Sequence, residues 1–147
     1  MDAVNPSDRE LRALLGRAHT VAVVGLSSRP GRPSFEVASY LQEHGYRIVP
    51  VNPNETEVLG ECAYPSLPEV PPEIRIDVVD VFRRPEHTPE VARQAVERGA
   101  RVLWLQEGIV NDEAAAVATA AGLDVIMGVC IKHVRERLLE RQGEETA

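Results

Sequence analysis

The chain has 147 residues, 44% of them hydrophobic, which is enough to fill the core of one ordinary domain. Its net charge of −7 excludes a broad nucleic-acid surface, although a few arginines in one cleft can still bind a small phosphorylated ligand. The longest apolar runs have strand length, and residues 1–10 lack a basic and apolar leader, so we expect no membrane span and a cytoplasmic protein. Cys62 and Cys130 stand far apart outside any metal-type motif and are expected to be free, buried thiols.

The first half of the chain alternates helices with apolar strands. In chain order we expect a helix over 7–18, a strand over 19–26, a helix over 34–45 and a strand over 46–53. Ser7 is the expected cap of the first helix, because Glu10 three residues later completes a capping box. Ser34 is the expected N-cap of the second helix, which Gly45 ends.

The second half repeats this alternation after a proline-rich stretch. Residues 54–75 favour a short strand near Cys62 and a single helical turn near Leu67. Thr88 and Asn111 are the expected caps of the two helices that follow. The remaining elements are a strand over 76–82, a helix over 88–99, a strand over 101–108, a helix over 111–122, a strand over 123–128, a terminal helix over 130–142 and a frayed tail over 143–147.

This order of elements predicts an α/β fold. Short loops between strands and helices require a parallel sheet with right-handed crossovers and helices on both faces. We therefore expect a Rossmann-like, doubly wound parallel sheet in one three-layer α/β/α domain over residues 1–147. Ligands of such folds bind at the carboxyl ends of the strands, which here are the loops after Val24, Val51, Val81, Leu105 and Ile126.

The loop after the first strand carries the chemistry of a phosphate site. It reads G-L-S-S-R-P-G-R-P-S, longer than the usual dinucleotide turn. Gly25 permits a close backbone approach, Ser34 opens a helix whose N–H groups favour an anion, and Arg29 and Arg32 add positive charge. The alternative is a plain strand-to-helix loop with a serine cap and solvated arginines.

Three further strand ends offer polar groups. Asn52 stands where NAD enzymes usually carry an acidic residue for the ribose hydroxyls, so it is either a ligand contact or a turn residue. Phe82 and Arg83 could flank a base and its phosphates, the alternative being a core phenylalanine with a solvated arginine. Gln106 and Glu107 could donate to or accept from the same ligand. Trp104, inside its strand, is expected in the core.

No catalytic constellation is visible in the sequence. His87 lies near the expected site without an obvious nucleophile beside it. Cys130 and His133 share a helix face at i, i+3, a spacing that more often reflects packing than chemistry. We therefore expect a binding module rather than an enzyme.

Several blocks of the chain together resemble a known family. They are G-x-S-x-x-P-x-R-x-S after the first strand, V-N-P after the second, V-F-R after the third and Q-E-G-I after the fourth, with a late cysteine. Over about residues 7–140 the chain is similar to the small stand-alone CoA-binding proteins, whose domain is like the N-terminal part of the succinyl-CoA synthetase alpha subunit. The resemblance implies CoA as the ligand.

The resemblance also assigns residues to the ligand. It implies that the first loop faces the CoA phosphates through Ser27, Ser28, Arg32, Pro33 and Ser34. It implies that the other strand ends contribute Asn52, Pro53, Phe82, Arg83, Gln106, Glu107 and Gly108. The synthetase needs a second domain and a partner subunit for ligation, so we expect CoA or acyl-CoA binding without catalysis.

Two other functions stay open at this point. The chain could be a small NAD(P)-binding oxidoreductase or a subunit of an acyl-CoA ligase. Asn52 and the extended first loop favour CoA over NAD(P). We expect a monomer with a small-molecule ligand and neither nucleic acid nor membrane as a partner.

Overall fold

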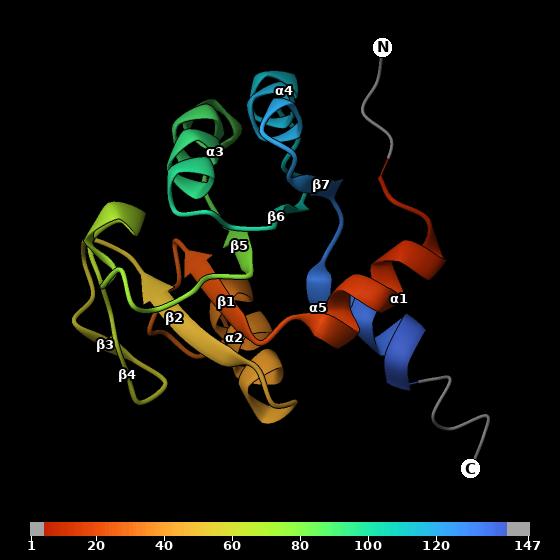
Figure 1. The fold of residues 1–147 in the computed structure, drawn as a ribbon. Coiled ribbons are helices and arrows are strands. Elements are labelled where there is room, and N and C mark those ends of the chain that lie inside the picture. The colour runs from red at the N-terminus through yellow and green to blue at the C-terminus, as the bar shows by residue number, and fades with distance from the viewer. Residues whose placement is uncertain (1–4, 141–147) are drawn as a thin grey trace.

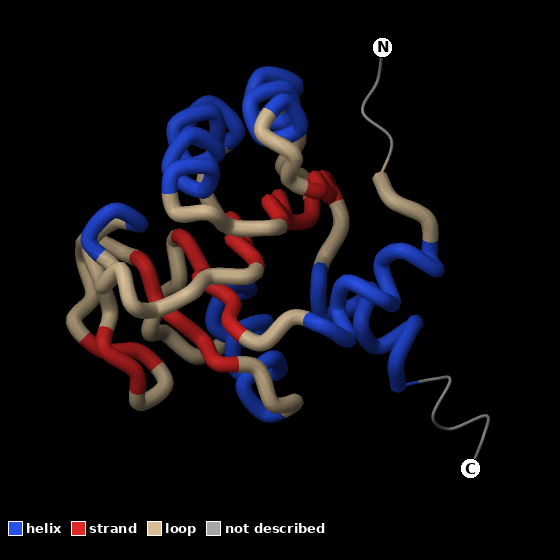
Figure 2. The backbone as a smooth tube through the Cα atoms, viewed as in Figure 1, coloured by secondary structure: helices blue, strands red, loops and turns tan. Residues whose placement is uncertain are grey.

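A five-stranded parallel sheet forms the middle of the structure, a computed structural model that describes residues 5–140 (Figures 1 and 2). Its strands run side by side in the order β2-β1-β5-β6-β7. Their bounds are β1 Thr20–Val24, β2 Arg47–Val51, β5 Val78–Val81, β6 Val102–Glu107 and β7 Asp124–Gly128. A separate antiparallel hairpin joins β3 Glu57–Val58 to β4 Glu61–Cys62.

Helices cover both faces of this sheet (Figure 1). One face carries α1 Asp8–Arg17, α2 Pro33–Glu43 and α5 Ile131–Arg135, which continues as a π-helical turn over Glu136–Glu140. The other face carries α3 Thr88–Glu97, α4 Asp112–Ala120 and the 3₁₀ turn η1 Leu67–Glu69. The expected doubly wound, three-layer α/β fold is therefore confirmed.

The strand order places a topological switch between β1 and β5. From β1 the chain crosses to β2 on one side, and from β5 it crosses to β6 and β7 on the other. Helices that leave neighbouring strands in opposite directions open a crevice at the carboxyl ends of those strands. The middle strands are buried on both faces, as their continuous apolar runs predict. Trp104 lies in the core as expected, and its indole N–H donates to the Val129 carbonyl at 2.9 Å.

The expected helix caps are confirmed at two positions and wrong at two others. Ser7 and Asn111 accept from the backbone N–H three residues ahead, at 3.2 and 2.9 Å. Ser34 is not a cap, because α2 already begins at Pro33, a residue that favours the first helical position. Thr88 lies inside α3 and donates to the Pro85 carbonyl at 2.7 Å, because a 3₁₀ turn over Pro85–His87 leads into this helix.

Both cysteines are free thiols, but only one of them is partly buried. Cys130 is partly buried, whereas Cys62 is exposed, which corrects the expectation of two buried thiols. Cys62 lies in β4, a two-residue strand of the separate hairpin outside the main sheet. The expected strand near Cys62 and helical turn near Leu67 are both present.

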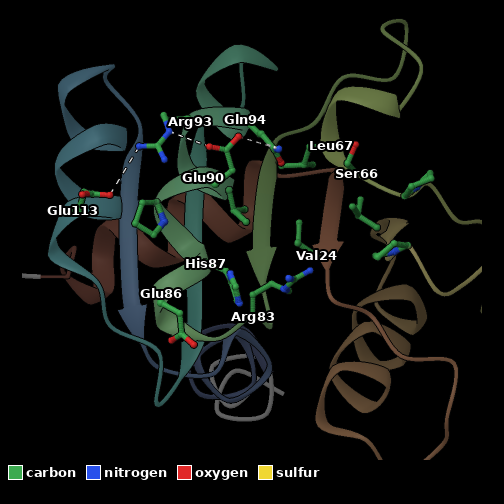
Figure 3. Close-up of a pocket in the computed structure, with 15 residues that line it drawn as sticks. Val24, Ser66, Leu67, Arg83, Glu86, His87, Glu90, Arg93, Gln94 and Glu113 are labelled. Carbon is green, nitrogen blue, oxygen red and sulfur yellow. Dashed lines mark hydrogen bonds and ion pairs between the residues drawn. The ribbon is translucent and has the colours of Figure 1, made fainter.

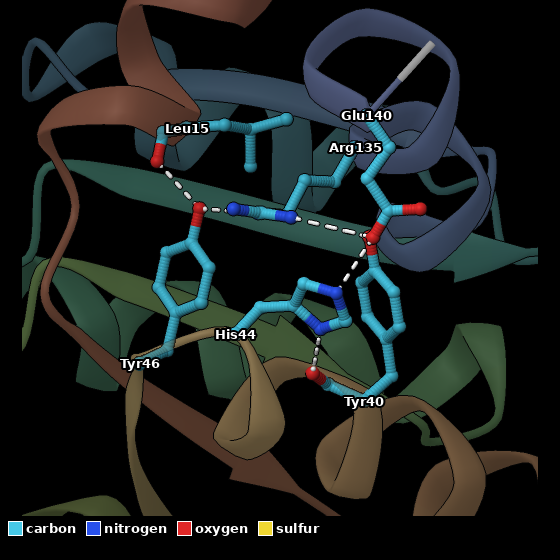
Figure 4. Close-up of polar contacts among 6 residues, drawn as sticks. All are labelled: Leu15, Tyr40, His44, Tyr46, Arg135 and Glu140. Atoms are coloured by element: carbon cyan, nitrogen blue, oxygen red, sulfur yellow. Dashed lines mark hydrogen bonds and ion pairs between the residues drawn. The ribbon is translucent and has the colours of Figure 1, made fainter. Parts of the chain in front are cut away.

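A polar cluster fastens α5 to the body of the domain (Figure 4). Tyr40 donates to the Glu140 carboxylate at 2.8 Å, and His44 Nε2 lies 2.7 Å from the same oxygen. Arg135 donates to the Tyr46 hydroxyl at 3.0 Å, which in turn donates at 2.6 Å to a carbonyl of α1. The cluster holds the last helix against α1 and α2, and thereby positions its N-terminal end beside the crevice.

The expected tail at 143–147 and the last residues of the terminal helix lie outside the described part of the chain. Within residues 5–140, no helix is both long enough and apolar enough to cross a membrane.

Candidate functional site

The first loop turns away from β1 at a glycine that no other residue could replace without strain. Gly25 has φ +90, and its N–H donates to the Val51 carbonyl at 2.8 Å. A Cβ at this position would collide with the carbonyl oxygen of Phe82. Gly25 therefore allows the chain leaving β5 to lie directly against the chain leaving β1, which brings two of the expected site segments together.

Serine side chains hold the rest of this loop in shape. The Ser34 hydroxyl accepts from the Ser27 N–H at 3.0 Å, and the Ser27 hydroxyl accepts from the Arg29 N–H at 3.1 Å. Gly31 donates its N–H to the Glu36 carboxylate at 2.7 Å. Ser34 is thus a residue that positions the loop rather than a helix cap, and the loop is organised before any ligand arrives.

The N-terminal end of α2 faces this loop. The helix has 11 residues, and its N-cap residue, Arg32, makes no capping hydrogen bond through its side chain within the described chain. The first-turn N–H groups of a helix have no intrahelical acceptor and favour an anion. Arg32 is itself exposed at that end, and Arg29 is exposed in the same loop. Two arginines therefore stand in the loop that leads to the positive end of the helix, where the Glu36 carboxylate also lies.

Asn52 organises the end of β2. Its side-chain amide donates to the Leu26 carbonyl at 3.0 Å, and its side-chain oxygen accepts from the Asn54 N–H at 2.9 Å. Both ends of the amide are therefore engaged with backbone. Asn52 is therefore a turn residue that ties the β2 end to the first loop, and its contact with a ligand stays a prediction. Ser28 turns toward the same segment and donates to Glu55 at 3.0 Å.

A pocket of about 370 Å³, here called the α2 pocket, opens between α2 and the ends of β5 and β6. Five of the expected site residues line it. The full lining is Pro33, Val37, Phe82, Arg83, Gln106, Glu107, Ile109 and Cys130. Cys130, absent from the residues expected at the site, comes from the segment that leads into α5. Gly108 follows directly in the turn after β6, with φ +80.

A second pocket of about 350 Å³ lies on the opposite face, against α3, and is here called the α3 pocket (Figure 3). Pro53 and Arg83 are the expected site residues that line it, and Arg83 lines both pockets. Arg93 is engaged there by Glu90 at 3.2 Å and Glu113 at 3.9 Å. Arg93 is therefore already paired with carboxylates and is less available to a phosphate in the α3 pocket.

Asp80 lies fully buried in β5 and is a residue that the sequence analysis missed. Burial raises the pKa of its carboxyl to about 8, although a hydrogen bond from the Gln106 amide opposes that rise. The Gln106 side-chain oxygen accepts from the Ile131 N–H at 3.4 Å, which links this pair to α5. Within residues 5–140 the other Asp80 oxygen has no hydrogen-bond partner. The available signal for this buried carboxyl was an aspartate, the second of two, inside the apolar run IDVVDVF.

Comparison with known proteins bears on the nature of this site. The model of a family described as a CoA binding domain matches residues 19–136. The chain belongs to this CoA-binding domain family. The expected resemblance is confirmed, and the match includes every expected site residue from Gly25 to Gly108.

Relatives and solved structures agree with that assignment. The chain is 47% identical over 128 residues to the uncharacterized protein YneT of Bacillus subtilis, covering 87% of this chain and 93% of that protein. A hypothetical protein from Pyrococcus horikoshii OT3 superposes with a TM-score of 0.87 at 40% identity, covering 95% of this chain and 99% of that one.

A larger enzyme contains a related segment. The acetate–CoA ligase (ADP-forming) II of Archaeoglobus fulgidus is 32% identical over 84 residues, which cover 56% of this chain. The match spans only 12% of that ligase, so most of the ligase has no counterpart in the match.

Proposed function

We propose that the protein binds coenzyme A, or an acyl-CoA, at the carboxyl ends of β1, β5 and β6, as a module that performs no chemistry of its own. The observation that carries the proposal is the meeting of the first loop and the α2 pocket at the switch point of a chain in the CoA-binding family. The first loop offers positive charge and free helix N–H groups, and the pocket offers a mostly apolar lining.

The proposed arrangement follows the charge of the ligand. The CoA phosphates lie against the first loop, near Arg32 and the N-terminal end of α2. The uncharged pantetheine arm passes Phe82 and Arg83 and enters the α2 pocket. Gln106 lines the pocket while engaged with Asp80, so it fixes the shape of the floor.

The oxidoreductase alternative finds less support at the end of β2. A nicotinamide dinucleotide would need an acceptor for its ribose hydroxyls at that position. The Asn52 amide is engaged at both ends by backbone groups of the neighbouring loops. Ligation, in turn, is the activity named for a relative of which the match spans only 12%. Binding without catalysis, in the cytoplasm, is the function that we propose.

The test is a calorimetric titration with CoA of the parent protein and two arginine variants. Arg32→Ala should weaken binding about tenfold or more, because a charge-assisted hydrogen bond to phosphate contributes about 1.5–3 kcal/mol. Arg101→Ala is the matched control, since Arg101 is exposed just before β6, at the amino ends of the strands and so opposite the proposed site. Equal losses in both variants, or none in Arg32→Ala, would remove the first loop from the site.

A further inference from the structure

The α2 pocket contains a thiol that phosphate binding does not use. Cys130 lines this pocket together with Phe82 and Gln106, and it immediately precedes α5 in the chain. The thiol is free and partly buried, whereas Cys62 is free and exposed on the β3–β4 hairpin. The protein therefore places one of its two thiols where the reactive end of the proposed ligand would arrive.

A buried carboxyl with one unpartnered oxygen lies beneath the same pocket. Asp80 precedes Phe82 by two residues, so strand alternation puts both side chains on the α2 face of the sheet. The Asp80 carboxyl contacts Gln106, which lines the pocket. Its second oxygen is buried without a partner among the residues described. Buried polar atoms are rarely left in this state.

We propose that Cys130 captures the thiol end of CoA as a mixed disulfide. The inference rests on the proposed function and names CoA disulfide as the oxidised co-reactant. The Cys130 thiolate attacks one sulfur of the CoA disulfide, a protein–CoA disulfide forms, and the old sulfur–sulfur bond breaks. The second CoA leaves as a thiolate and takes up the proton that Cys130 released. A small-molecule thiol reverses the step.

Binding through the phosphates, and not the reactivity of the thiol, makes the capture selective. Burial raises the pKa of the Cys130 thiol, and the nearby carboxyls of Asp80 and Glu107 act in the same direction, against the backbone N–H groups of His133 and Lys132. Little thiolate is then present at neutral pH, which slows attack on every disulfide alike. A disulfide already bound through its CoA phosphates reacts at a high effective concentration.

The experiment incubates the protein with CoA disulfide and locates the adduct by mass spectrometry of the intact chain and of its peptides. We expect one CoA per chain, on Cys130, in the parent protein and in Cys62→Ser, and none in Cys130→Ser. Capture should be at least about tenfold faster than with glutathione disulfide, because only the former can bind first. Arg32→Ala should lose most of this advantage.

Two results would overturn the inference: modification of Cys62 as fast as that of Cys130, or equal rates with the two disulfides. The proposed function has a separate readout in the same samples. The parent protein should bind reduced CoA in the calorimeter, because this binding needs no disulfide. A parent protein that binds reduced CoA but forms no adduct with CoA disulfide would contradict the capture alone. A parent that does not bind CoA would contradict the proposed function itself.

Discussion

Asp80 is a carboxyl group that the fold keeps away from water in the middle of β5. Its pKa is raised to about 8 by burial, with the Gln106 hydrogen bond opposing the rise. The folded protein therefore retains a proton that the unfolded chain releases near pH 4. Between those values the unfolded state binds fewer protons, so stability falls as the pH rises.

This residue gives a prediction about pH. Asp80→Asn should keep the contact with Gln106 through its side-chain oxygen while removing the titration. The parent should lose up to about 1.4 kcal/mol of unfolding free energy per pH unit between pH 5 and 8, and the variant should lose much less. Urea unfolding at several pH values measures both slopes. Parallel slopes would show that Asp80 is ionised in the folded protein.

At the scale of elements, the first loop and α2 behave as one unit because Ser34 joins them. The Ser34 hydroxyl holds the Ser27 N–H at 3.0 Å, seven residues back along the chain. A cap would act only on the first turn of its own helix. The bond to Ser27 instead sets the path of the loop that we propose for the phosphates.

The two serines at helix starts therefore predict different phenotypes. Ser34→Ala should cost about 0.5–1.5 kcal/mol of stability and also weaken CoA binding, because the loop loses its anchor. Ser7→Ala should cost about 0.5–2 kcal/mol through loss of the α1 cap, with CoA affinity unchanged. Thermal unfolding and titration calorimetry on both variants test this. Equal CoA affinity in the two variants would count against the role of Ser34.

At the scale of the whole molecule, sequence patterns were sufficient for the architecture. Short apolar runs such as 76–82 are typical of strands buried on both faces, and their alternation with helices requires crossovers. The carboxyl-end site follows from that topology. The α2 pocket was predictable in most of its lining, because strand ends and the start of α2 supply Pro33, Phe82, Arg83, Gln106 and Glu107.

The remaining features depend on distances that sequence patterns do not encode. Ser34 was misjudged because serine at a helix start usually caps, and its actual partner lies in the loop. Cys130 enters the α2 pocket only because α5 folds back beside β6 and is fastened by the cluster around Arg135 and Glu140 (Figure 4). Cys62 is exposed on a two-residue strand that lies outside the main sheet.

The size and surface of the molecule predict a monomer. Val110 is the one large hydrophobic side chain that is well exposed among residues 5–140, at 55% of its surface. Stable dimers need larger apolar areas. Multi-angle light scattering at micromolar concentration should give the mass of a single chain, with and without CoA. The mass of two chains would contradict this prediction.

The measurement that tests the central claim most directly is the melting temperature with CoA and with NAD, each at a hundred times the dissociation constant measured for CoA. At that ratio a ligand stabilises the fold by about 2.7 kcal/mol. For a chain of this size that corresponds to a shift of roughly 5–10 °C. We expect this shift with CoA and a much smaller one with NAD, because Asn52 is engaged by backbone groups. Equal shifts with both ligands, or no shift with CoA, would contradict the account.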